Sequence, residues 1–495
     1  MTRDSLRLQA SARLMICKLV SITLAMFLSF PSSALASPRG GLSQRVRLAM
    51  AASALLGTVI EVNTTGDGDN INPSAGCDTD AATPGNQCSL RAAIQQANAV
   101  AGDDEIHFNI PLTEPNCIAA SSSCYLYLTN TLPPLGTNVR IIGPGSDKIS
   151  IRRSTGGDYR IFTVTAATDI TISGVTISNG RPAGLNVGGA IANAGNATVN
   201  ILDSVLSYNV AGADGGDGGA IANAANGIIN IVNTLVTDNS ASIPVVDGAA
   251  GGGGAILNSS TGTVNISGSF FADNKVQGGR HYSSNRGGVI HNTSAGAVNV
   301  TNSALVHNTV TVGVASYSSG GGAAIANSGE GTVTVVNSVF ADNLVTGGDQ
   351  TSDLMGGGVL NVASTGKVDI TQSIFSNNII YGGSANGGGG GIFNASGVVN
   401  VSNSTLTGNR GLGGGIKGQA TVKNTIIAKN NFGPSSGSDI SGTFTSAGFN
   451  LVGVEDGSTG FNGADQKGTA AAPLDPKFDP NTVDLPFVNG TVPVP

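Results

Sequence analysis

The chain has 495 residues, of which 73 are glycine, 11% are charged and none is tryptophan. A hydrophobic content of 40% is too high for a disordered chain, and the absence of a Gly-x-y period excludes collagen. The formal net charge of −7 at pH 7 disfavours binding to nucleic acid and to anionic lipid.

Residues 1–36 have the pattern of an export signal. Four basic residues precede an apolar run over 19–30, and an Ala-Leu-Ala motif ends at Ala36. We therefore expect a signal peptide cleaved near Ala36, a linker at 37–58, and a protein that is secreted or associated with the outer surface of the cell. Neither 19–30 nor the apolar stretch at 48–60 suits a membrane span, so an integral membrane protein is not expected. A later start codon that uses 48–60 as the signal is the alternative.

The segment 59–135 is expected to form an N-terminal cap region. It contains the four cysteines that follow the signal, at Cys77, Cys88, Cys117 and Cys124. An even cysteine count in an exported chain predicts two disulfides, with three pairings open and the local one favoured by loop length. Zinc is disfavoured because no Cys-x-x-Cys or histidine pair lies at ligand spacing.

Residues 89–99 are predicted to form a helix that covers the open end of the fold. Ser89 is the expected N-cap and Gly102 the stop, and the apolar residues between them lie on one helical face. A repeating β-fold needs such a plug because an open end exposes both core and strand edges.

Between residues 136 and 432 we expect a repeating β-structure. A Gly-Gly-Ala-Ile-like turn recurs from 188 onward, with its aliphatic position every 24 to 35 residues, and is followed by a Val-x-Ile strand and a Ser/Thr-x-aliphatic-x-x-Asn motif. Apolar and polar residues alternate with period two, which indicates strands rather than helices. Earlier, less regular strands are expected at 139–142, 149–151, 161–164 and 170–172. Three short strands per coil, each pairing with the same strand of the next coil, predict a single-stranded right-handed parallel β-helix.

Stacking the repeats aligns like residues in columns. An interior apolar column is predicted at Leu206, Val236, Phe271, Leu305, Phe340, Phe375, Leu406 and Ile427. An asparagine ladder is predicted at Asn209, Asn239, Asn274, Asn308, Asn343, Asn378, Asn409 and Asn430. Asparagine suits such corners because its amide both donates and accepts hydrogen bonds and tolerates a left-handed backbone.

The motif Cys-Ser-Leu-Arg-Ala-Ala at 88–93 resembles the Cys-Ser-Leu-Arg-Glu-Ala region of exported bacterial right-handed β-helix proteins, with Ala92 in place of glutamate. The repeats are similar to the Gly-Gly-Ala-Ile and Phe-x-x-Asn repeats of polymorphic outer membrane proteins. Residues 441–451 and 468–476 look like the closing segment of such proteins, so 433–495 is expected to be a C-terminal cap or tail. The resemblance implies an exported or surface protein, in a group whose members mostly have no established reaction.

The residues that precede the ladder asparagines form an outward row with acid, base and metal-binding potential. Its charged central members are Asp238, Asp273, His307 and Asp342. The carboxylates around His307 suit glycosidic acid–base chemistry, and Asp238 with Asp273 suits Ca²⁺, the only cofactor that the pattern suggests. The alternative is a solvated face on which aspartate begins each turn.

Loops that follow each corner asparagine leave one side of the fold and are expected to form a wall. Most are Gly, Ser and Ala, but the loop at 275–286 carries Arg280 and His281 near His291 and His307. Such a basic loop suits an anionic sugar, as in β-helix polysaccharide lyases, a comparison that rests on fold alone. A decorated surface loop is the alternative.

Two functional hypotheses follow from these patterns. The first is a secreted or cell-surface structural or adhesive β-helix that binds polysaccharide or host and cell-surface molecules without chemistry. The second is a polysaccharide lyase or glycoside hydrolase with a groove along the rod. The absence of tryptophan and the aromatic content of 4% disfavour the second, because sugar grooves rely on aromatic platforms.

Overall fold

The computed structural model describes residues 57–478, except 167–168, 185–186, 213–215, 244–249, 279–283, 314–316, 350, 384–387 and 431–437, together with 483–487 and 490–494. The expected signal peptide at 1–36 and nearly all of the linker at 37–58 lie outside these residues. Within the described ranges, no helix has the length and apolar character needed to cross a bilayer.

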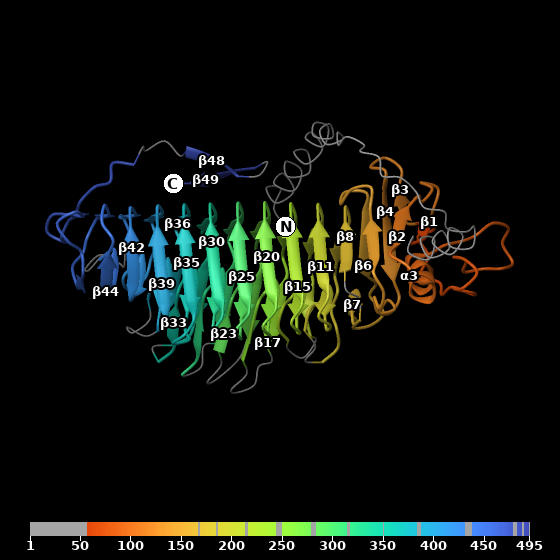
Figure 1. Cartoon of the computed structure of the whole chain (residues 1–495), viewed down its shortest axis with the longest axis horizontal. Helices are drawn as coiled ribbons and strands as arrows, with labels where there is room; N and C mark the ends of the chain where they lie inside the picture. The colour runs from red at the N-terminus through yellow and green to blue at the C-terminus, as the bar shows by residue number, and fades with distance from the viewer. Residues whose placement is uncertain are drawn as a thin grey trace, which may run out of the picture.

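The chain forms a long stack of parallel coils, so the expected single-stranded parallel β-helix is confirmed (Figure 1). Neighbouring coils pair in register, which places identical residues beside one another: Asn230 pairs with Asn265, and Asn265 with Asn299. Three sheets, named here A, B and C, run along the rod.

Sheet A contains β1 (Val59–Val62), β2 (Asp104–Phe108), β5 (Val139–Ile142), β8 (Asp169–Ser173), β11 (Thr198–Leu202), β15 (Ile228–Val232), β20 (Thr263–Ser267), β25 (Ala297–Thr301), β30 (Thr332–Val336), β35 (Lys367–Thr371), β39 (Val398–Ser402), β42 (Ala420–Lys423), β44 (Ile440–Ser446) and β46 (Ser458–Thr459). Sheet C contains β7 (Phe162–Val164), β10 (Ile191–Asn193), β14 (Ile221–Asn223), β19 (Ile256–Asn258), β24 (Ile290–Asn292), β29 (Ile325–Asn327), β34 (Val359–Asn361), β38 (Ile392–Asn394) and β41 (Ile416–Gly418). Strand β44 pairs with both β41 and β42 and so joins the two sheets.

Sheet B contains β3 (Cys117–Ile118), β4 (Ser123–Leu128), β6 (Ile149–Arg153), β9 (Thr176–Ser178), β12 (Val205–Ser207), β16 (Leu235–Thr237), β21 (Phe270–Ala272), β26 (Ala304–Val306), β31 (Val339–Ala341), β36 (Ile374–Ser376), β40 (Thr405–Thr407), β43 (Ile426–Ile427), β45 (Leu451–Val452) and β47 (Gln466–Lys467). Strand β3 is antiparallel to β4, whereas the other described strands of this sheet pair in parallel. A separate antiparallel hairpin is made of β48 (Val483–Phe487) and β49 (Gly490–Val494).

The interior of the rod is built from stacks of like residues. Each member of the predicted apolar column, from Leu206 to Ile427, is fully buried. The rings of Phe340 and Phe375 stack with centroids 4.6 Å apart. Because parallel in-register strands repeat at ~4.8 Å, a flat side chain meets its counterpart in van der Waals contact on the next coil.

The corner between sheet B and the segment that follows it shows how the asparagine ladder is held. Asn274 Oδ1 accepts hydrogen bonds from the backbone N–H of Asn239 at 3.1 Å and from its Nδ2 at 3.0 Å. Asn274 Nδ2 in turn donates to Asn308 Oδ1 at 3.0 Å and to the Val236 carbonyl at 2.9 Å. Each buried amide therefore satisfies polar groups of two neighbouring coils.

The left-handed backbone at this corner belongs to a different residue from the one expected. The residue before each ladder asparagine has positive φ, for example 57° at Asp238 and 55° at both Asp273 and His307, whereas the ladder asparagines do not. Asparagine is therefore selected here for its amide. The sharp turn is made by the outward residue, whose side chain has space on the convex side.

The other two corners carry ladders of their own. At the end of sheet C, Asn258 Nδ2 donates to Asn292 Oδ1 at 2.9 Å, in a series that runs from Asn193 to Asn394. Between sheets A and B, buried serine and threonine hydroxyls accept backbone N–H groups from the preceding coil, as Ser303 Oγ does from Ser269 at 3.1 Å.

At the C-terminal end, an aspartate closes the ladder. Asp439 Oδ1 accepts from the backbone N–H of Asn430 at 2.7 Å and from Asn430 Nδ2 at 2.9 Å, and its Oδ2 accepts from the Val454 N–H at 2.7 Å. All three contacts need an acceptor, which a carboxylate provides and an amide provides only in part. Burial nevertheless raises the pKa of Asp439 to about 6, against the hydrogen bonds that lower it.

The raised pKa of Asp439 gives a pH-dependent contribution to stability. Protonated Asp439 stabilises the folded protein. This contribution is fully present below pH 3.8, the pKa of the residue in the unfolded chain, and it is lost as the pH rises through about 6, its pKa in the folded protein. Relative to Asp439→Asn, the wild-type free energy of unfolding should therefore fall by up to about 3 kcal/mol between pH 4 and pH 7. Urea unfolding of both proteins measures this difference, in which the other titrating groups cancel. A difference that stays constant with pH would contradict the prediction.

The wall expected from loops is made of further strands, which corrects the expectation of three strands per coil. One parallel layer, sheet D, contains β13 (Val210–Ala211), β17 (Ser240–Ile243), β22 (Lys275–Gly278), β27 (Thr309–Val312), β32 (Leu344–Gly347) and β37 (Ile379–Gly382). The second layer, sheet E, contains β18 (Ala250–Gly252), β23 (Ser284–Arg286), β28 (Ser319–Gly321) and β33 (Asp353–Met355).

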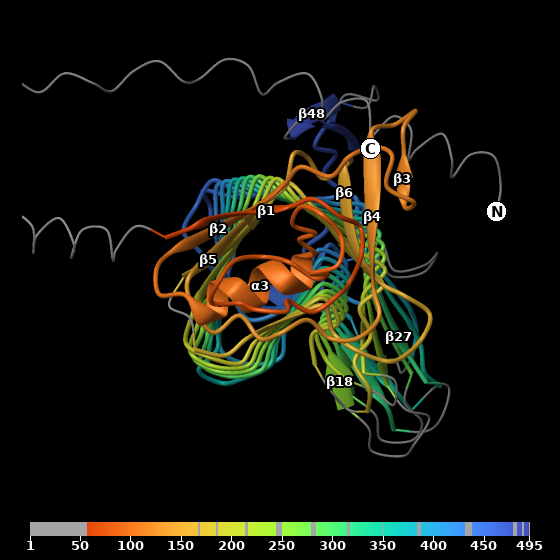
Figure 2. The same cartoon turned by 90° about the vertical axis from the view of Figure 1, so that its right-hand side faces the viewer.

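These two layers form a fin that projects from one side of the rod, where β18 and β27 are seen in Figure 2. The fin has a small apolar core of its own, which includes Val276, Val310, Val345 and Leu354. Short Gly- and Ser-rich segments can form strands here because each lies beside the same segment of the next coil, so pairing compensates for weak intrinsic propensity.

The N-terminal end of the rod is covered by the expected helix, α3 (Leu90–Ala99), which lies across the end of the coil stack (Figure 2). The Ser89 hydroxyl caps it by accepting the Ala92 N–H at 3.0 Å, and Leu90 and Ile94 are buried against the interior. The helix ends at Ala99, and Val100 rather than Gly102 supplies the C-cap. The nearby disulfides join Cys77 to Cys88 and Cys117 to Cys124, which is the local pairing.

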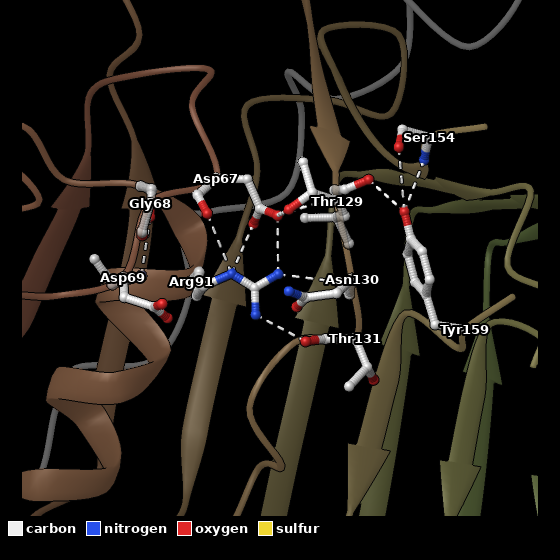
Figure 3. Close-up of polar contacts among 12 residues, drawn as sticks. Asp67, Gly68, Asp69, Arg91, Thr129, Asn130, Thr131, Ser154 and Tyr159 are labelled. Carbon is white, nitrogen blue, oxygen red and sulfur yellow. Dashed lines mark hydrogen bonds and ion pairs between the residues drawn. The ribbon is translucent and has the colours of Figure 1, made fainter. Parts of the chain in front are cut away.

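Arg91 ties this cap to the first coils (Figure 3). Its Nε donates to Asp67 Oδ1 at 3.0 Å and one terminal nitrogen reaches Asp67 Oδ2 at 2.9 Å, while the guanidinium also donates to the carbonyls of Asn130 at 3.0 Å and Thr131 at 2.7 Å. Asp67 Oδ2 additionally accepts the N–H of Thr129. Helix, N-terminal loop and sheet B therefore meet at one buried ion pair.

Candidate functional site

The outward row predicted from the sequence is assembled at the corner between sheet B and sheet D. The strands on either side pair in register, so Asp238, Asp273, His307 and Asp342 project from successive coils. All four have the left-handed backbone that aims their side chains outward. Successive coils are ~4.8 Å apart, which brings these charges within interaction range.

The row contains one ion pair and one carboxyl with a shifted pKa. His307 Nε2 lies 3.6 Å from Asp342 Oδ2, and both side chains are exposed. Partial desolvation, and then the negative charge of Asp238, raise the pKa of Asp273, while His307 lowers it. A carboxyl with a raised pKa between a second carboxylate and a histidine can act as a proton donor, although every member of the row is open to water to some degree.

The predicted basic loop at 275–286 lies partly outside the described residues. Arg280 and His281 lie outside the described residues, so their position relative to Asp273 and His307 stays a prediction. Lys275, at the start of β22, is exposed, whereas Arg286 and His291 are drawn inward at the base of the fin. In the described portion of the chain, no group of three or more His, Cys, Asp or Glu side chains is arranged to hold a metal ion. The Ca²⁺ proposal for Asp238 and Asp273 therefore gains no support from geometry.

A second surface, on the outer side of sheet A, was not singled out by sequence reasoning. The central residues of its strands form an outward asparagine row in which Asn230 Nδ2 donates to Asn200 Oδ1 at 2.8 Å, Asn265 to Asn230 at 2.9 Å and Asn299 to Asn265 at 2.9 Å. In the sequence, this row could have been recognised from the asparagine that recurs as the middle residue of the Val-x-Ile strands.

From β11 to β30 every outward residue of sheet A is uncharged. Threonine, serine, asparagine and aliphatic side chains cover this region, and charges flank it at Asp169 of β8 and at Lys367 and Asp369 of β35. The five coils extend over about 20 Å at the parallel-strand spacing. This uncharged face is regular, with the same groups repeated at each coil.

No protein-family model, curated protein or solved structure matches this chain. The acidic row and the uncharged face of sheet A are the two candidate sites on its described surface. The acidic row offers proton transfer without a described enclosing cleft. The uncharged face offers an ordered array of amides and hydroxyls, which suits recognition of an extended neutral polymer rather than chemistry.

Proposed function

We propose that this protein is an exported β-helix scaffold that acts in a structural or adhesive role and binds an extended, uncharged polymer, such as a neutral polysaccharide, along the uncharged face of sheet A. The observation that carries the proposal is the outward asparagine row, whose amides are pre-ordered by side-chain hydrogen bonds to one another. A pre-ordered face loses little side-chain entropy when it binds a repeating partner.

Three further observations support an extracellular setting. The N-terminal pattern is that of an export signal, the two disulfides suit an oxidising compartment, and the 88–93 motif resembles that of exported bacterial β-helix proteins. We therefore propose a secreted or cell-surface location and kinship with the group that combines this motif with polymorphic-outer-membrane-protein-like repeats.

The proposal is tested by sedimenting the purified protein with insoluble neutral polysaccharides and by measuring its affinity for soluble neutral and acidic ones. The double variant Ile228→Lys/Ala297→Lys places two charges on alternate coils of the face, in the row where Lys367 already stands, so the fold should be kept. We expect at least a tenfold loss of affinity for the neutral polymer that binds. The matched control is Tyr208→Lys, at the corner position that Lys429 occupies on a later coil.

Equal affinity of the double variant and wild type would overturn binding at this face. So would failure of wild-type protein, shown to be folded, to bind any neutral polymer in the panel.

The second candidate function is a polysaccharide lyase or glycoside hydrolase, favoured by the row of Asp273, His307 and Asp342. The same panel is assayed for reducing ends and for unsaturated products, with and without Ca²⁺. Turnover that Asp273→Asn abolishes, without loss of polymer binding, would favour the enzyme. Binding without turnover would favour the scaffold.

A further inference from the structure

Arg286, the last residue of β23, is a half-buried cation that has no acidic partner among the residues that the structure describes. One of its terminal nitrogens donates to Ser328 Oγ at 3.1 Å, and its Nε is buried without a hydrogen-bond partner. Within the described residues no carboxylate pairs with it: Glu330 is exposed and makes no ion pair, and Asp217 uses Oδ1 to accept the Gly252 N–H at 2.6 Å. A cation drawn partly out of water with so few partners is costly unless a counter-ion is supplied.

Two other inward-facing arginines show how the fold can satisfy such a group. Arg91 is paired with Asp67, and Arg160 donates to the carbonyls of Gly188 and Val187. Both therefore have acceptors within the chain. Arg286 has one hydroxyl, which is a weaker partner than a carboxylate and leaves part of its planar donor fork unused.

His291, on β24, lies beside this arginine and cannot neutralise it. Its Nε2 is 3.1 Å from Ser328 Oγ, and its Nδ1 is buried without a partner. Burial, together with the positive charge of Arg286, lowers the pKa of His291 to about 3, so the ring is neutral at physiological pH. A side chain at Gly252 of the preceding coil would come within 2.3 Å of Nδ1, so this glycine provides the space in which the ring lies.

We infer that Arg286, His291 and Ser328 form a binding site for a small carboxylate, such as acetate or the carboxyl group of a uronic acid. The guanidinium supplies a positive charge and charge-assisted donors, and the hydroxyl of Ser328, a half-buried residue, lies 3.1 Å from one of its terminal nitrogens. The site lies at the base of the fin and is distinct from the uncharged face of sheet A. The inference therefore goes beyond the proposed function and does not depend on it.

The inference is tested by NMR titration of the full mature protein with sodium glucuronate, with acetate to test the carboxylate alone and glucose as the neutral control. We expect glucuronate to shift the His291 ring resonances and glucose to leave them unchanged. Arg286→Gln should weaken glucuronate binding at least tenfold, and Ser328→Ala by roughly threefold to tenfold, consistent with loss of a charged and of a neutral hydrogen bond. Lys275→Gln removes an exposed positive charge on the same coil and should change affinity less than twofold.

Absence of binding to wild type would overturn the site, as would equal losses in Arg286→Gln and Lys275→Gln, which indicate general charge attraction. If Arg286→Gln fails to fold, Ser328→Ala decides: unchanged affinity overturns the site, and a selective loss supports it. Neutral-polymer binding measured on the same variants should be unaffected, so failure of this site and failure of the proposed function give different results.

Discussion

Replacing Arg91 by methionine is expected to lower the free energy of unfolding of the N-terminal cap by about 3 to 5 kcal/mol, the range for removing one partner of a buried ion pair. The side chains of Arg91 and Asp67 are 6% and 5% exposed. Methionine fills much of the volume but removes the guanidinium donors of two backbone carbonyls and leaves the buried Asp67 carboxylate with no cationic partner, held only by the N–H and hydroxyl of Thr129. The loss should appear first in residues 59–135, because a solenoid can unfold from one end.

Hydrogen exchange resolved by segment and urea unfolding together measure this effect. The matched control is Arg140→Met, which removes an arginine that pairs with Glu105 at 2.6 Å while its side chain is 56% exposed. We expect a change of only ~0–1 kcal/mol there, since solvent screens the pair. Similar losses in the two variants would show that Arg91 does not organise the cap through its buried position.

Replacing Asn308 by alanine is expected to destabilise the middle of the rod by about 3 to 5 kcal/mol, from two or more unsatisfied buried polar groups at ~1–3 kcal/mol each. Asn308 Oδ1 is the acceptor for both the N–H and Nδ2 of Asn274, at 3.0 Å each. Its Nδ2 donates to the carbonyls of Phe271 at 3.1 Å and Val306 at 3.0 Å. Alanine removes all of these at a fully buried position that water cannot reach.

The control for this variant is Asn299→Thr on the same coil. Asn299 belongs to the outward row of sheet A, and the next coil has Thr334 at the paired position, so threonine is compatible with the sheet. We expect a change of less than ~1 kcal/mol, as is usual for surface substitutions. Urea midpoints of the two variants, with circular dichroism to verify β-structure, provide the comparison. Comparable destabilisation would mean that interior and surface ladders contribute alike.

The coil architecture could be predicted from the sequence because the fold repeats its contacts. Phe340 contacts Phe375, and Asn274 contacts Asn308, because parallel in-register coils place equivalent positions of the repeat side by side. Residues that recur at one position of the repeat are therefore predicted to be in contact. The helix over 89–99 could also be predicted, because its N-cap Ser89 and the N–H that it accepts lie within a few residues of each other in the sequence.

Features that depend on non-equivalent positions could not be predicted in this way. Arg91 reaches Asp67 across 24 residues, and Arg286 and His291 both contact Ser328 of the next coil. The sequence predicts that Arg91 belongs to a cap and that 275–286 is a loop, but it contains no signal that Arg286 turns inward.

The sequence by itself therefore determined the parallel β-helix, its interior columns, its asparagine ladder and the row of Asp238, Asp273, His307 and Asp342, because each is a property of one repeat. Only the tertiary structure decided that the wall is a stranded fin with its own core, and that left-handed turns fall before the ladder residues. It also decided which polar groups are left without partners. Those outcomes depend on the space and the hydrogen-bond partners that neighbouring coils provide. The sequence of a single repeat does not specify either of them.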